Sequence, residues 1–231
     1  MARKAKIDNA LIKKLQHKEA KRKIETKSKR AYFLIVCEGE RTEPNYFQAI
    51  KESFPIGSIS IIDIEGTGKN TIRIIDECIS IRAKSFKKYD RIWAVFDRDS
   101  FPAVNFDNAI NKAEANKINC AWSNEAFELW FLLHFQFVST PMSRDLYKSF
   151  IEREVRNKGL ANYTYLKNSN STYEVLESRG NKNQAIAWAK LLEKEYTDRS
   201  YSRHNPCTKV HLLIEELHNP EKIIEFNNNC D

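Results

Sequence analysis

The sequence lacks any long apolar segment. Its longest apolar runs are about seven residues, whereas a helix that crosses a membrane needs about 20. The first 30 residues contain no apolar stretch of the kind that a signal peptide requires. We therefore expect a soluble, cytoplasmic protein that has no membrane partner.

Two common kinds of motif are also missing. The five cysteines include no Cys-x-x-Cys pair, and no histidine stands at zinc-finger spacing from them, which predicts reduced thiols and no zinc site. The loop Gly66–Thr71 reads GTGKNT and lacks the spacing of a Walker A motif. The sequence gives no sign of a P-loop nucleotide site or of internal repeats.

Charge is distributed unevenly along the chain. Residues 1–30 contain 12 Lys and Arg against 3 Asp and Glu, a net charge of +9, whereas the remaining residues have a net charge of −2. A segment this basic attracts phosphate backbones, and a plain solubilising tail has the same composition. We treat residues 1–30 as a separate basic tail that binds nucleic acid or an acidic partner protein.

Residues 31–135 alternate between short apolar runs and helical patterns. Strands are expected at 31–37, 59–64, 91–97 and 118–122. Strands of this kind separated by helices are typical of βαβ units. The predicted fold class is α/β, with a mainly parallel Rossmann-like sheet that has helices on both faces.

Residues 136–231 are predicted to form a helical C-terminal region, of which residues 139–204 are more polar than the core. We expect helices at 142–157, 181–196 and 206–218, with Asn205 as the N-cap of the last one and Pro206 in its first turn. This C-terminal region is predicted to pack on the core as a helical cap at the edge of the sheet, beside the substrate.

Two of the predicted strands end in acids. Glu38 follows the first strand, and Asp97 and Asp99 follow the third. The carboxyl edge of an open α/β sheet is where ligands bind, and Mg²⁺ prefers oxygen ligands. The three acids therefore predict a Mg²⁺ (or Mn²⁺) site, although acids at strand ends are often only hydrated.

Further candidates lie around this edge. Glu43 and Glu128 each open a helix, where an acid either complements the helix dipole or joins the metal site. Gly39 permits close backbone approach, and Lys69 either contacts phosphate or is an ordinary exposed lysine. The residues predicted to bind substrate are Gly39, Lys69, Asn70, Asn124, Lys148 and Lys167.

Four motifs of the sequence resemble the RloB-like family. They are FLIVCEGERTEPNYF at 33–47, VFDRDSF at 95–101, SNEAFELWFLLHF at 123–135 and NPCTKVHLLIEEL at 205–217, in the family's order. The family tends to have proline where this chain has Glu125. The basic tail varies within the family, so the resemblance assigns it no role.

The resemblance implies a Toprim fold and work in bacterial abortive infection, often beside an AAA-type ATPase. In Toprim proteins the acid that matches Glu38 transfers a proton, and the pair that matches Asp97 and Asp99 binds Mg²⁺. The implied activity is a Mg²⁺-dependent nuclease acting on tRNA or DNA. The sequence leaves open whether the chain forms a homo-oligomer.

Two other functions remain open at this stage. The sequence FDRDS also resembles the Asp-x-Asp of haloacid-dehalogenase phosphatases, in which Asp97 would be the nucleophile, although that motif usually follows the first strand. The third hypothesis is a module without catalytic activity, which binds nucleic acid or an ATPase and whose acids only hold the fold together.

Overall fold

The computed structural model describes residues 30–68, 71–99 and 102–228. The basic tail up to residue 29 and the candidates Lys69 and Asn70 lie outside the described residues. No helix in the described part of the chain has the length and apolar character needed to cross a membrane.

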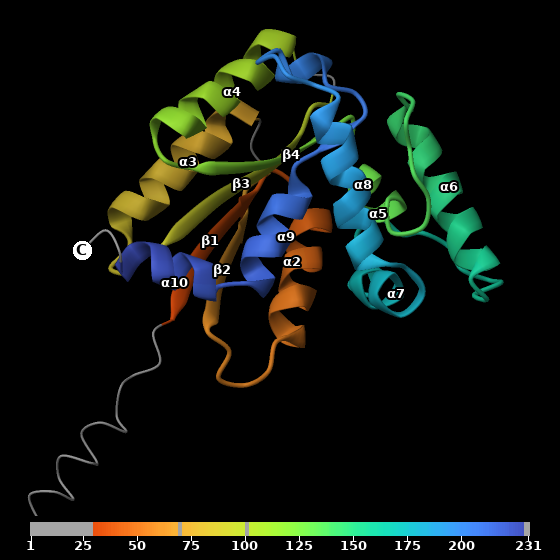
Figure 1. The fold of residues 1–231 in the computed structure, drawn as a ribbon, viewed down its shortest axis with the longest axis horizontal. Coiled ribbons are helices and arrows are strands. Elements are labelled where there is room, and N and C mark those ends of the chain that lie inside the picture. Colours follow the sequence, from red (N-terminus) through yellow and green to blue (C-terminus); the bar gives the residue numbers. More distant parts are fainter. Residues whose placement is uncertain (1–29, 69–70, 100–101, 229–231) are drawn as a thin grey trace, which may run out of the picture.

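A single five-stranded sheet forms the centre of the fold (Figure 1). Its order is β2-β1-β3-β4-β5, in which the first four strands run parallel and the last pair is antiparallel. In chain order the strands are β1 (Ala31–Cys37), β2 (Ser60–Gly66), β3 (Arg91–Asp97), β4 (Asn119–Asn124) and β5 (Cys207–Thr208).

The central strands are apolar on both faces because both faces are covered. In β1, Phe33 and Ile35 enter one hydrophobic core, and Leu34 and Val36 enter the other. All four side chains are fully buried. A parallel sheet with helices on both sides produces such continuous apolar strands, as the sequence predicted.

The helices change face where the order of strand addition reverses (Figure 1). Helix α2 (Thr42–Ser53) connects β1 to β2 on one face, whereas α3 (Thr71–Lys84) and α4 (Ala103–Ala115) cover the other. A constant hand of crossover requires this exchange of faces. The predicted α/β class, with a mainly parallel sheet and helices on both faces, is confirmed.

The C-terminal region is helical, as expected. Its first helix, α6 (Arg144–Asn157), begins at the carboxyl edge of the sheet and contacts α5 (Glu128–Leu132), the last helix of the core region. The other elements in chain order are α7 (Thr172–Arg179), α8 (Lys182–Lys194), the 3-10 turn η1 (Tyr201–Arg203), α9 (Val210–His218) and α10 (Glu221–Asn228).

The start of the last predicted helix is wrong. Residues 207–208 form β5, and α9 begins only at Val210. The Lys209 backbone N–H donates to the Trp122 carbonyl oxygen, and the hydroxyls of Ser123 and Thr208 lie 2.9 Å apart. Pairing with β4 therefore overrides the local helix signal of Asn205-Pro206.

Helix α9 belongs to the core. Its residues Val210, Leu213, Ile214 and Leu217 are buried in the same hydrophobic core as α2. At its far end the Leu217 carbonyl accepts a hydrogen bond from the Ser60 hydroxyl, which lies at the start of β2. The helices of the predicted cap therefore lie in two different places. Helix α6 begins at the carboxyl edge of the sheet, whereas α9 covers one face of it.

His134 is buried just after α5, and its burial has a consequence for stability. Its Nδ1 donates to the Trp130 carbonyl oxygen at 2.9 Å, and burial lowers the pKa of His134 to about 4. An unfolded histidine has a pKa of about 6.5, so between pH 6.5 and 4 the unfolded chain takes up a proton that the folded chain does not. This difference destabilises the fold by up to about 3 kcal/mol at low pH.

Replacing His134 with Gln removes this titration. We expect the free energy of unfolding of wild type to fall relative to that of His134→Gln as the pH is lowered from 7 to 4, measured by urea denaturation. His134→Gln carries an offset from lost packing that is constant with pH. Two stability curves that stay parallel over this range would contradict the assignment.

Candidate active site

The carboxyl ends of β1 and β3 lie side by side. The two strands are parallel neighbours, and the chain order reverses between them, which is the position where doubly wound sheets bind ligands. Glu38 follows β1, and its Oε2 accepts a hydrogen bond of 3.2 Å from the backbone N–H of Asp97, the last residue of β3. Glu38 and Asp97, two of the predicted catalytic acids, are therefore direct neighbours at the carboxyl edge of the sheet.

A single arginine connects Asp97 to Asp99. Arg144, the first residue of α6, donates from one terminal nitrogen to Asp97 Oδ2 at 3.1 Å and from the other to Asp99 Oδ2 at 3.0 Å. Asp99 has a φ of 39°, in the left-handed region that Asp tolerates better than most residues. This backbone conformation turns the chain at the point where the two carboxylates share one guanidinium.

Glu43 turns inward from the first turn of α2. It is 8% exposed, and a Cβ added at Gly39 would collide with its carboxylate. A side chain at position 39 would force the Glu43 carboxylate to move. A close approach to the backbone of Gly39 was predicted at the end of β1. The group that makes this approach in the structure is the carboxylate of Glu43.

The loop between α6 and α7 contacts both Glu128 and the start of α2. Glu128 is 6% exposed, and its Oε1 accepts a hydrogen bond of 3.1 Å from the Tyr165 hydroxyl. The carbonyl of Lys167 accepts from the Thr42 hydroxyl at 2.8 Å, which fixes the loop against the start of α2. Burial raises the pKa of the Glu43 carboxyl, and the positive charge of Lys167 opposes part of that rise.

The acids at the ends of β1 and β3 and their neighbours Glu43 and Glu128 carry more negative charge than Arg144 can balance. Burial raises the pKa of Asp97 well above its usual value, and the carboxylates of Glu43 and Glu128 raise it further. Burial also raises the pKa of Glu43, helped by Glu128. For Arg144, burial opposes the charge, but Asp97 and Asp99 outweigh it and raise its pKa. The site as a whole therefore favours one more cation.

The chemistry of the donors fits Mg²⁺ or Mn²⁺. All candidate ligands are carboxylate oxygens, and Asp97 Oδ1 is buried without a hydrogen-bond partner among the described residues. In the described ranges, however, no three acids, histidines or cysteines are grouped closely enough to hold a metal ion as they stand. Two of the carboxylates, those of Asp97 and Asp99, are paired with Arg144.

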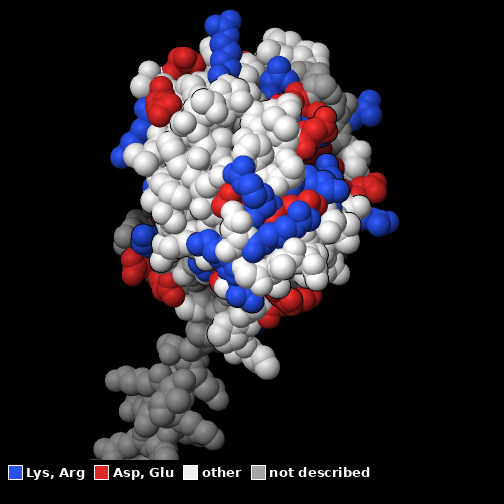
Figure 2. All heavy atoms as spheres, turned by 90° about the vertical axis from the view of Figure 1, so that its right-hand side faces the viewer, with Lys and Arg blue, Asp and Glu red and all other residues white. Residues whose placement is uncertain are grey.

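The other predicted substrate-binding residues have different surroundings. Asn124 ends β4, is 2% exposed and donates to the Ser202 carbonyl, so it holds η1 against the sheet. Lys148 is exposed one turn beyond Arg144 on α6 and shares its side of the helix. Figure 2 shows Lys and Arg gathered with acids on the face that carries α6.

Sequence reasoning missed two residues of the site. The first is Arg144. It is one of several basic residues in a polar helix, and no sequence pattern distinguishes it from the others. The other is Tyr147, one turn earlier than Ile151 on the buried side of α6, whose hydroxyl is buried without a partner among the described residues. Burial raises the pKa of Tyr147, and the charges of Glu125 and Asp97 add to the effect.

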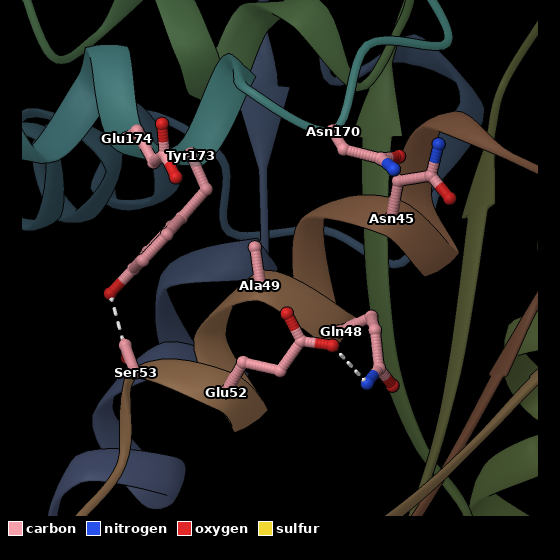
Figure 3. A pocket seen from close by; sticks show the side chains of 8 residues that line it. All are labelled: Asn45, Gln48, Ala49, Glu52, Ser53, Asn170, Tyr173 and Glu174. Atoms are coloured by element: carbon pink, nitrogen blue, oxygen red, sulfur yellow. Dashed lines mark hydrogen bonds between the residues drawn. The ribbon is translucent and has the colours of Figure 1, made fainter.

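A cavity of about 380 Å³ lies apart from these ion pairs, between α2 and α7 (Figure 3). Its lining includes the amides of Asn45 and Gln48 and the carboxylates of Glu52 and Glu174, with no Lys or Arg. Tyr173 and Ser53 close one end through a hydroxyl contact of 3.1 Å. Its negative lining does not suit a phosphate group.

The fold and the site define a doubly wound α/β protein with carboxylates concentrated at the reversal between β1 and β3. A family model described as RloB-like protein matches residues 33–217. The chain therefore belongs to the RloB-like family, and the match extends from β1 into α9, across every site residue described above. No curated protein and no solved structure matches the chain.

Proposed function

We propose that this protein is a metal-dependent nuclease of the Toprim type that cleaves phosphodiester bonds in antiviral defence. The substrate is a nucleic acid, tRNA or DNA, and the cofactor is Mg²⁺ or Mn²⁺. An AAA-type ATPase is the proposed partner.

One observation carries the proposal. The three acids that the sequence singled out converge at the carboxyl ends of adjacent strands, where Asp97 bonds to Glu38 through its backbone and shares Arg144 with Asp99. Burial raises the pKa of Asp97, and the nearby carboxylates of Glu43 and Glu128 raise it further. An excess of carboxylates at a ligand-binding edge supports a site for a divalent cation.

The residues divide the proposed chemistry among them. Asp97 and Asp99 would hold the ion. The nearby carboxylates of Glu43 and Glu128 would add negative charge to the site. A bound divalent cation supplies Lewis acidity at a phosphoryl oxygen and stabilises the leaving oxygen. Glu38, which is half-buried at the same edge, would accept the proton of the attacking water. Lys167 would bind a phosphate oxygen beside Glu43.

A cleavage assay tests the proposal directly. Wild-type protein is incubated with tRNA, single-stranded DNA and plasmid, with Mg²⁺, with Mn²⁺ and with a chelator. We expect at least one of the three substrates to be cleaved. This cleavage should require the metal, and its rate should rise in proportion to the protein concentration. The absence of metal-dependent cleavage with all three nucleic acids, in the presence of the partner ATPase as well, would overturn the proposal.

A module without catalytic activity is the second candidate, and Arg144 favours it. A guanidinium that bridges both aspartates can hold the β3 end to α6 with no metal at all. In that case the acids stabilise the fold, so that changing them lowers the stability of the protein. Neither wild type nor the variants would then cleave nucleic acid. The two candidates thus differ in the effect of substitutions at Asp97.

A further inference from the structure

We propose that Arg144 is a positioning residue with two successive partners. It neutralises Asp97 and Asp99 while no divalent cation is bound, and it pairs with a phosphate oxygen of the substrate once the cation has taken its place. This inference rests on the proposed function, since it concerns the same pair of aspartates.

The charge balance gives Arg144 its first role. Asp97 is 8% exposed and lies within reach of two further buried acids, Glu43 and Glu128. Without a cation these carboxylates repel one another. Arg144 contacts Asp97 at 3.1 Å and Asp99 at 3.0 Å, and among the described residues it is the cation in direct contact with both. A divalent cation that bound to the same oxygens would compete with it.

The unused atoms give Arg144 its second role. Among the described residues, no group makes a hydrogen bond of good geometry to buried Asp97 Oδ1 or to buried Arg144 Nε, although the backbone N–H of Phe127 acts on the Asp97 carboxyl. Asp97 Oδ1 can still accept from a donor or a cation, and Arg144 Nε can still donate to an anion. A metal ion together with a phosphate group supplies both, and a planar guanidinium is well suited to bind phosphate through two nitrogens.

The position of Arg144 permits the exchange of partners. It is the first residue of α6, the side chain of its N-cap Ser143 makes no capping hydrogen bond, and its own side chain is 31% exposed. The guanidinium therefore borders solvent on one side and the carboxylates on the other. A long side chain anchored at a helix start can turn by rotamer changes alone.

The test compares Arg144→Gln with wild type in two measurements. We expect Mn²⁺ to bind Arg144→Gln without nucleic acid on the order of tenfold more tightly, because an internal competitor is gone. The rise in Tm that Mn²⁺ produces should also be larger than in wild type. In the presence of Mn²⁺, the affinity for a short single-stranded DNA and for tRNA should instead fall about tenfold.

Matched variants keep the outcomes distinct. Arg153→Gln makes the same chemical change on the same helix, at an exposed arginine that pairs with Glu154 instead of with the site acids, and should alter neither measurement. Arg144→Lys keeps one charge without the bridge and should fall between the two proteins. An Mn²⁺ affinity that Arg144→Gln leaves unchanged or weakens, while wild type binds Mn²⁺, overturns the role of Arg144 alone. If neither protein binds Mn²⁺, the proposed metal-dependent function itself is overturned.

Discussion

Asp97→Asn is expected to reduce metal-dependent cleavage by at least about a thousandfold. Asp97 is the most buried of the three central acids and the one through which Glu38 and Arg144 are joined to the end of β3. Asparagine keeps the size of the side chain but loses the charge that would hold a divalent cation. The measurement is the rate of cleavage at saturating Mg²⁺ on the substrate found in the assay.

The stability of the same variant separates a catalytic from a structural role. Burial and neighbouring acids raise the pKa of Asp97, so its charged form is disfavoured in the metal-free fold. Asparagine relieves that repulsion, and we expect the Tm without metal to hold or rise. Asp145→Asn, an exposed acid on α6, is the matched control. A lower Tm together with undiminished cleavage would make Asp97 a structural residue.

Deleting residues 2–30 is expected to weaken binding to every nucleic acid by at least about a hundredfold at low salt. This segment carries 12 of the 38 Lys and Arg residues, and the rest of the chain has a net charge of −2. Contacts with phosphates release counterions, so the slope of log K against log salt should flatten after deletion. Such contacts position a substrate and do not read its bases.

A shuffled tail is the sharpest control for this deletion. It keeps the composition and net charge of residues 2–30 and changes their order. If the tail acts only through its charge, the shuffled protein should bind nucleic acid as wild type does, with the same salt slope. An unchanged slope after deletion, together with loss of the ATPase in a pull-down, would assign the tail to the partner protein instead.

The sequence was sufficient to predict the sheet and its acidic edge. The strands β1 and β3 are continuous apolar runs because both faces of the sheet are covered, and each run stops where the chain leaves the core. An acid at such a stop must lie at the carboxyl edge of a parallel strand. The meeting of Glu38 and Asp97 therefore followed from local pattern and general topology.

What the sequence could not give were the features that depend on contacts between distant segments. Strand β5 has two residues and exists only through its pairing with β4. Arg144 looks like any basic residue of α6, and its role comes from the approach of that helix to the end of β3. Tyr165 reaches Glu128 from a loop 37 residues further along the chain. No periodicity reports contacts of this kind.

The late position of α9 in the chain constrains how this protein is made. The face of the sheet that α2 covers stays partly open until residues 210–217 arrive, since they supply four buried apolar side chains of that core and the Leu217 carbonyl that accepts from Ser60 across 157 residues. During synthesis at about 5–20 residues per second the emerging β1 and β3 would expose that side for many seconds. Any chaperone that shields this part of the sheet until α9 arrives would therefore protect the apolar core on which the ends of β1 and β3 are supported.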